Sequence, residues 1–245
     1  MSTLARILLT LTALAMPVTS ISVPPSTFDT SPGQAITPPG IFFAIWGVII
    51  VSCWAVAVVA WVKPESAVLR AAAWPLVIAQ AGFSVWLVFA GLPRSAVVIG
   101  SIGTVATFAV IIASLLVAMA RMRGTAGQWR WVIAGTVGLY AGWSSAAIWL
   151  NVVTCLPASL ADSVAVQSFG VVAAAAGVVA VIVLLRPSRS YAVAVIWAFI
   201  GIASSAASFS AWTPFVLALV GIVIVIAVDV RSALVSRKEV ATASA

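Results

Sequence analysis

Charged residues are scarce in this chain. Only 7% of its 245 residues are Asp, Glu, Lys or Arg, whereas 64% are hydrophobic. A soluble domain carries roughly 25% charged residues, because its surface must face water. So few charges exclude a soluble fold. The composition instead predicts an all-α polytopic membrane protein in contact with the lipid bilayer.

Histidine is missing altogether, and the two cysteines are Cys53 and Cys155. Without histidine, neither zinc nor a histidine-ligated haem iron has an obvious set of ligands. The sequence therefore predicts no metal site and no required cofactor. Cys53 falls within a predicted helix and Cys155 at the end of another, so their depths differ and no disulfide is expected between them.

Catalytic signatures are also lacking. The chain has no Ser-His-Asp set, no phosphate-binding loop and no pair of carboxylates within a predicted span. We therefore assign no catalytic residue. A proton-coupled pump would usually carry a buried Asp or Glu in a span. No Asp or Glu falls in the middle of a predicted span here, which weakens a transporter interpretation without excluding passive transport.

The formal net charge is +7, but this excess of basic residues does not indicate nucleic-acid binding. The twelve Lys and Arg residues are scattered singly between apolar runs and form no basic patch. They are better interpreted as signals of membrane topology.

Eight apolar segments approach the roughly 20 residues that a helix needs to cross the hydrocarbon core. They cover residues 4–23, 39–62, 71–92, 95–120, 131–153, 163–185, 191–208 and 212–228. We expect the first to be a retained helix; the alternative is a cleaved signal peptide. The Pro-, Ser- and Thr-rich residues 24–38 are predicted to form a loop.

The positive-inside rule tests this arrangement. With the N-terminus inside, eleven of the twelve basic residues lie in cytoplasmic segments and only Arg94 lies outside. Seven or nine spans would break the alternation. We therefore expect both termini in the cytoplasm and a location in a bacterial inner (cytoplasmic) membrane.

One stripe of the fifth span has an unusual composition. At 100° per residue, five side chains fall within about 100° of each other: Tyr140, Trp143, Ser144, Ala147 and Asn151. Such a mixture suits a small-molecule pocket, which needs flat apolar walls and a few polar groups. Alternatively, the small residues permit close helix packing and the amide sits at the interface. Spacing alone leaves both interpretations open.

Aromatic residues of three spans are expected at a similar depth. Given the predicted orientation, Trp46, Trp86 and Trp143 fall in the middle or outer part of their helices. These residues are predicted to line one chamber on the outer side of the membrane, with the 24–38 loop as its lid.

The run from Pro38 to Trp46, PPGIFFAIW, resembles the second-helix signature of the TspO/MBR family, the tryptophan-rich sensory proteins related to the mitochondrial translocator protein. That family also has, in its fifth helix, a Tyr, then a Trp three residues on, an Ala seven on and Leu-Asn ten and eleven on. The residues here are Tyr140, Trp143, Ala147, Leu150 and Asn151. The third helix matches less well. Trp86 stands at the position of the family's Trp, but Phe83 stands where the family has an Asn. Gln80, one turn earlier, is a candidate to supply the amide instead.

Other features differ from the five-helix family. Trp46 comes one residue early, the Tyr that usually follows it is missing, and this chain has eight spans. A longer TspO-like group with extra C-terminal helices is the nearer resemblance. We expect a TspO-like five-helix unit in residues 1–155, three additional helices in 156–231 and a cytoplasmic tail in 232–245.

The resemblance implies a membrane receptor or sensor that binds a hydrophobic, planar small molecule, such as a porphyrin, another tetrapyrrole or a sterol, and it suggests a homodimer. Asn151, Gln80 or Tyr140 would then bond a propionate or ring nitrogen. The alternative is a transporter or permease component for a small apolar substrate; a pigment-degrading enzyme and a structural subunit are further alternatives. The expected ligand-binding residues are Pro39, Phe42, Phe43, Trp46, Gln80, Phe83, Trp86, Tyr140, Trp143, Ala147 and Asn151.

Overall fold

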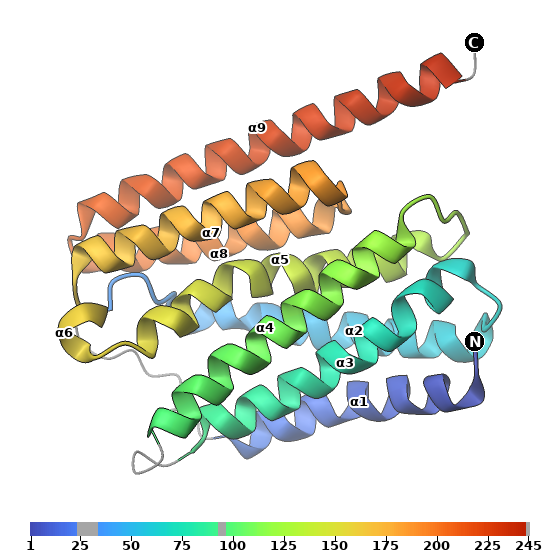
Figure 1. Cartoon of the computed structure of the whole chain (residues 1–245), viewed down its shortest axis with the longest axis horizontal. Coiled ribbons are helices and arrows are strands. Elements are labelled where there is room, and N and C mark those ends of the chain that lie inside the picture. Colours follow the sequence, from blue (N-terminus) through green and yellow to red (C-terminus); the bar gives the residue numbers. More distant parts are fainter. Residues whose placement is uncertain (24–33, 93–96, 244–245) are drawn as a thin grey trace.

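The computed structural model describes residues 1–23, 34–92 and 97–243, and within these ranges the secondary structure is helical. Eight long helices lie roughly alongside one another (Figure 1). They are α1 (Thr3–Ser22), α2 (Ile45–Val62), α3 (Ala67–Ala90), α4 (Val97–Met122), α5 (Arg130–Thr154), α7 (Val164–Leu185), α8 (Arg189–Ser208) and α9 (Trp212–Ala243). Two short elements, the 3-10 helix η2 (Gly40–Ala44) and α6 (Ala158–Ala161), complete the described elements.

The structure contains eight apolar helical stretches of 20 to 24 residues that can cross a membrane, and the second of them combines η2 with α2. At 1.5 Å per residue these stretches span at least about 30 Å, the thickness of the hydrocarbon core. The prediction of a polytopic all-α membrane protein with eight spans is therefore confirmed. The N- and C-terminal ends lie at the same end of the bundle (Figure 1), as an even number of spans requires.

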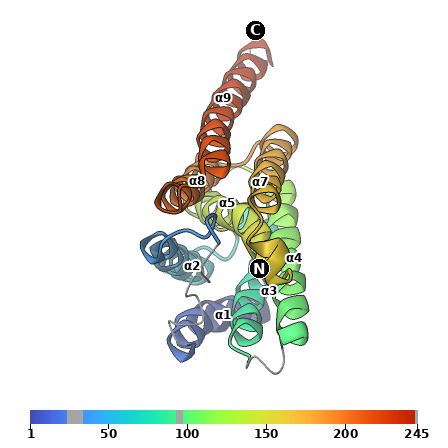
Figure 2. The same ribbon diagram turned by 90° about the vertical axis from the view of Figure 1, so that its left-hand side faces the viewer.

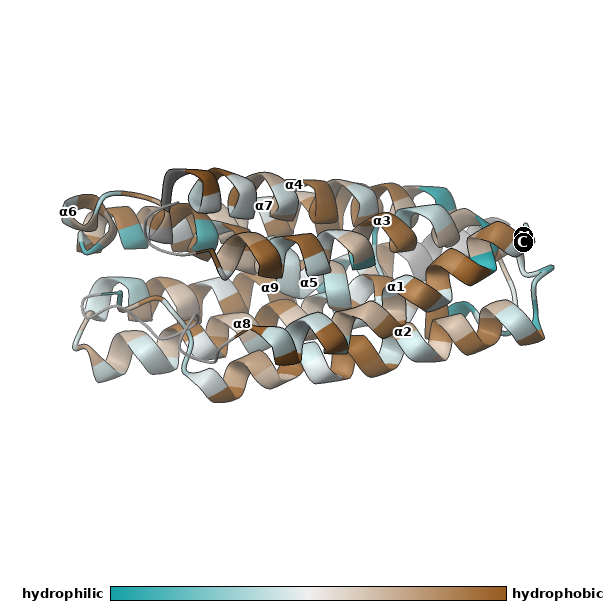
Figure 3. Ribbon diagram, turned by 90° about the horizontal axis from the view of Figure 1, so that it is seen from below, coloured by the Kyte–Doolittle hydropathy of each residue, from teal (hydrophilic) through white to brown (hydrophobic). Residues whose placement is uncertain are grey.

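Hydrophobic side chains cover the outside of this bundle. Val223 and Ile102 are each 66% exposed, and many other large apolar residues of the spans face outward. Most of the strongly hydrophilic residues lie near the two ends of the helices (Figure 3). This distribution suits a surface that faces lipid tails along its length and water at both ends.

Helix α5 is the central element. It contacts α2, α3 and α4 on one side and α7 and α8 on the other, while α9 packs against α7 and α8 (Figure 2). In its membrane stretch 67% of the residues are buried, against 22% in α1 and α9. The predicted division near residue 155 stays a prediction, and α5 borders both of the units it would separate.

Glycine allows α5 and α8 to approach closely. A methyl group at Gly142 would collide with the carbonyl oxygen of Tyr191, and one at Gly138 would collide with the hydroxyls of Ser188 and Ser190. Small residues at such positions let helix backbones come together in a membrane, where lipid is as apolar as the helix surface and gives little hydrophobic drive.

The segment before α2 does not continue as a regular α-helix toward the membrane surface. Pro39 precedes the 3-10 turn η2, and the α-helix begins only at Ile45. Of the predicted lid, residues 24–33 lie outside the described part of the chain. The remainder includes Ala35 and Ile36, which are buried.

Candidate ligand-binding site

Helices α2, α3 and α5 bring four aromatic rings around Trp46. The ring centroid of Trp46 lies 4.6 Å from that of Phe83 and 5.9 Å from that of Trp86, whose plane is inclined to it by 30°. Tyr140 and Trp143 lie nearly perpendicular to the Trp46 ring, with ring centroids 5.7 Å and 6.3 Å away. These are the separations at which aromatic pairs attract one another beyond simple burial.

Two further rings extend this group. Phe43 meets Trp143 edge-on at 5.7 Å, and Phe108 of α4 meets Trp86 edge-on at 5.1 Å. We call the seven residues the aromatic cluster: Phe43, Trp46, Phe83, Trp86, Phe108, Tyr140 and Trp143. Phe108 was not expected from the sequence, because it belongs to no motif and only the packing of α4 on α3 brings it here.

The stripe of α5 faces the interior of the bundle. Tyr140 and Ser144 are fully buried, Trp143 is 1% exposed and Ala147 is 7% exposed. Asn151, one turn further along, is half-buried. Trp46 is also half-buried, so the aromatic cluster reaches the protein surface at α2.

Three of the polar side chains beside these rings, Tyr140, Trp86 and Asn151, have partners within the protein, whereas the buried Ser144 hydroxyl has none among the described residues. The Tyr140 hydroxyl donates to the carbonyl oxygen of Ala79 at 2.8 Å. The Trp86 indole nitrogen donates to Asn151 Oδ1 at 3.2 Å, and Asn151 Nδ2 donates to the Ala147 carbonyl at 2.8 Å. These bonds tie α5 to α3 and fix the orientation of the Trp86 ring.

The Trp143 indole nitrogen is different. It is buried and has no hydrogen-bond partner among the described residues. Buried indole N–H groups usually find an acceptor, because leaving one unpaired costs about 1–3 kcal/mol. An unpaired donor among aromatic rings is a place where an acceptor from outside the chain gains a bond.

Three of the expected site residues lie away from the ring contacts of the aromatic cluster. Gln80 is fully buried, and its Oε1 accepts a hydrogen bond from Thr12 of α1 at 2.6 Å. Phe42 packs on Trp197 of α8 with ring centroids 4.9 Å apart, and the Trp197 indole donates to the Phe42 carbonyl at 2.8 Å. Pro39 lies at the N-cap position of η2, immediately before its first residue.

No group of three or more potential metal ligands occurs in the part of the chain that the structure describes.

Comparison with known proteins identifies the family of this chain. The family model described as TSPO-like protein matches residues 3–230. The chain belongs to this family. The match runs from α1 through the apolar part of α9, so it supports a longer TSPO-like protein whose family resemblance includes the three C-terminal helices. No match was found among curated proteins, and none among solved structures.

Proposed function

We propose that this TSPO-like membrane protein is a sensor that binds a flat, apolar small molecule of the porphyrin or sterol class in the aromatic cluster. Membership of the family supports a membrane protein with a binding role. The observation that carries the proposal is the buried Trp143 N–H, which has no acceptor among the described residues, in the midst of aromatic rings.

A porphyrin offers both kinds of contact that the aromatic cluster can make, ring stacking and a hydrogen bond to the Trp143 N–H. Its planar face can stack on Trp and Phe rings. Its propionate groups are strong hydrogen-bond acceptors for a buried indole N–H. A sterol would share the apolar contact and offer a single hydroxyl.

The exposure of the rings favours entry of a ligand beside α2. Trp46 is half-buried, whereas Phe83, Trp86, Tyr140 and Trp143 are at most 5% exposed. Because Trp46 contacts all four of these rings, a ligand that displaced it would meet each of them. In this mechanism Trp46 moves aside and the ligand face replaces its contacts.

The proposed location is a bacterial cytoplasmic membrane with both termini inside, supported by the distribution of basic residues. A homodimer is proposed on the family resemblance alone.

The test is a titration of the purified protein with protoporphyrin, followed by the absorbance of the porphyrin and by Trp emission. Saturable binding at micromolar ligand is expected for the parent protein. It should be lost in the double variant Trp46→Leu, Trp143→Leu, which removes the central ring and the unpaired donor.

The matched control is Trp212→Leu, because Trp212 is 64% exposed on α9 and touches no ring of the aromatic cluster. This variant should bind as the parent does. Equal, weak spectral changes in all three proteins would mean partition into detergent and would contradict the proposal. Substrate flux in proteoliposomes without saturable binding would favour a transporter instead.

A further inference from the structure

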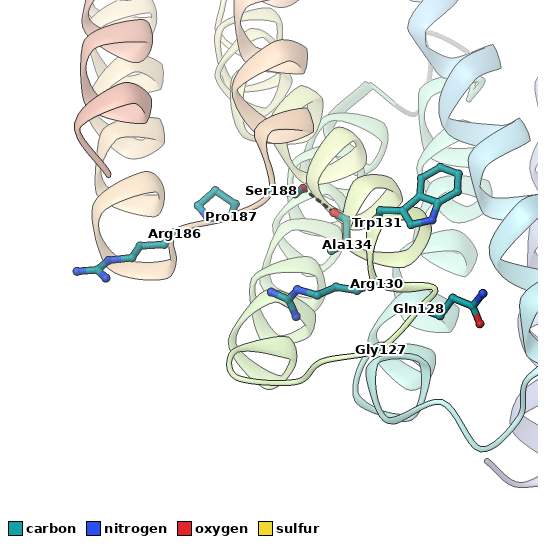
Figure 4. Close-up of a pocket in the computed structure, with 8 residues that line it drawn as sticks. All are labelled: Gly127, Gln128, Arg130, Trp131, Ala134, Arg186, Pro187 and Ser188. Atoms are coloured by element: carbon teal, nitrogen blue, oxygen red, sulfur yellow. Dashed lines mark hydrogen bonds between the residues drawn. The ribbon is translucent and has the colours of Figure 1, made fainter. Parts of the chain in front are cut away.

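A cavity lies at the end of the bundle that carries both termini, toward the beginning of α5 and away from the aromatic cluster. Its volume is about 410 Å³. Eight residues line it: Gly127, Gln128, Arg130, Trp131, Ala134, Arg186, Pro187 and Ser188. It therefore lies between the α4–α5 turn and the α7–α8 turn (Figure 4).

The charge of this cavity has one sign. Two of the lining residues are arginines and none is acidic. The Arg130 side chain extends toward the α7–α8 turn, whereas Arg186 extends away from the cavity at its rim (Figure 4). All the hydrogen bonds of the Arg130 side chain to described residues use Nη1, which donates to the Met122 and Thr125 carbonyls at 2.8 and 2.7 Å and to Thr125 Oγ1. Its other donors remain for an anion.

Two helix beginnings add to the positive potential. Helix α5 begins at Arg130 and α8 begins at Arg189, and neither has a side chain that caps its first N–H groups. One of these groups in each helix bonds a backbone carbonyl: the Arg130 N–H donates to Gly127 at 3.1 Å and the Tyr191 N–H donates to Ser188 at 2.9 Å. Helix N-termini attract anions through their remaining N–H groups and the helix dipole.

Hydroxyl groups hold the two beginnings together. Ser188 Oγ donates to the Ala134 carbonyl at 2.6 Å, the bond drawn in Figure 4, and Ser190 Oγ donates to the Gly135 carbonyl at 2.7 Å. The wall of the cavity is thus a fixed junction between α5 and α8.

The depth of the cavity fits the lipid headgroup layer. Trp131 lies in the first turn of α5, is 75% exposed and lines the cavity. An exposed Trp at the end of a span is typical of the membrane–water interface. Basic pockets between transmembrane helices at this level suit anionic phospholipid headgroups.

We propose that this cavity binds the phosphate group of an anionic phospholipid, such as a phosphatidylglycerol. Arg130 and the beginnings of α5 and α8 contact the phosphate, Arg186 adds positive charge at the rim, and the acyl chains run along the outside of the bundle. The site is independent of the aromatic cluster and of its proposed ligand.

Native mass spectrometry of the purified, detergent-solubilised protein tests this proposal. The probes are phosphatidylglycerol, phosphatidylcholine with the same acyl chains, and glycerol phosphate as a free anion. The parent protein should prefer phosphatidylglycerol. Arg130→Gln should weaken its binding roughly 5-fold, the value expected from removing one interfacial charge, and leave phosphatidylcholine binding unchanged.

Two further variants keep the test independent of folding. Ala134→Leu retains both arginines and narrows the cavity, so it should also reduce phosphatidylglycerol binding. Arg70→Gln removes an exposed arginine at the same end that bonds a carbonyl of its own turn and should have no effect. Equal phosphatidylglycerol affinity in the parent, Arg130→Gln and Ala134→Leu would overturn the proposal. Displacement of the lipid by equimolar glycerol phosphate would overturn the lipid source in favour of a soluble phosphate.

Discussion

At the scale of single residues, Trp46 organises the aromatic cluster. Its ring contacts Phe83 and Trp86 of α3 and Tyr140 and Trp143 of α5. Three helices, α2, α3 and α5, therefore meet at one indole. Spacing along the fifth span predicts that Tyr140 and Trp143 share a face, but it does not tell which rings from other helices oppose that face.

The limits of sequence reasoning at this scale have a physical cause. Phe42 and Phe43 are neighbours in one motif, yet the 3-10 turn sends Phe42 to Trp197 of α8 and Phe43 to Trp143 of α5. Similarly, Gln80 bonds Thr12 because α1 packs on α3. Helix pairing decides these contacts, and the periodicity of a single segment contains no information about pairing.

The Tyr140 hydroxyl gives a prediction that separates packing from hydrogen bonding. Tyr140→Phe keeps the ring beside Trp46 and removes only the 2.8 Å bond to Ala79. Its free energy of unfolding should fall by about 1 kcal/mol, the usual net value of a buried hydrogen bond. Thermal unfolding in detergent measures this change.

The control for that variant is Ser208→Ala, which removes an exposed hydroxyl bond within α8. It should change stability by less than about 0.5 kcal/mol. Equal effects of the two substitutions would show that the bond between α5 and α3 does not stabilise the bundle.

At the scale of elements, the contact between α5 and α8 gives a sharper prediction. Gly142→Ala places a methyl group against the Tyr191 carbonyl, so the two helices must separate. Forcing extra atoms into a packed contact costs about 1–3 kcal/mol, and a lower melting temperature is expected.

The matched variant is Gly135→Ala on the same helix, where an added methyl group meets no atom within 4 Å. It should be neutral or slightly stabilising, because Ala favours a helix more than Gly does. If both variants melt at the same temperature as the parent, close approach at Gly142 is unimportant.

The helices themselves could be predicted well from hydropathy, and their ends less well. The fifth span was expected at 131–153 and α5 covers Arg130–Thr154. The last span was expected to end at residue 228, but α9 continues to Ala243. Hydropathy detects only the part that crosses lipid, and a helix that projects into water beyond it carries no such signal. The four-residue helix α6 was missed because it is too short to show a periodic apolar pattern.

At the scale of the whole molecule, orientation in the membrane is the main expectation to test. In a variant without Cys53 and Cys155, one new cysteine is introduced by Gln128→Cys or by Leu160→Cys. Both positions are exposed and lie at opposite ends of α5. A membrane-impermeant maleimide added to spheroplasts should label the second variant only, because Gln128 is expected in the cytoplasm. The reverse pattern would place both termini outside.

The central position of α5 has a consequence for biosynthesis. Its glycine face at Gly138 and Gly142 packs against α8, which is synthesised about 50 residues later. At ordinary translation rates this delay lasts on the order of 3–10 s. During that interval the glycine face of the newly inserted α5 must be covered by lipid or by a temporary partner in the insertion machinery. The bundle therefore closes around its middle helix only after nearly the whole polypeptide has been made.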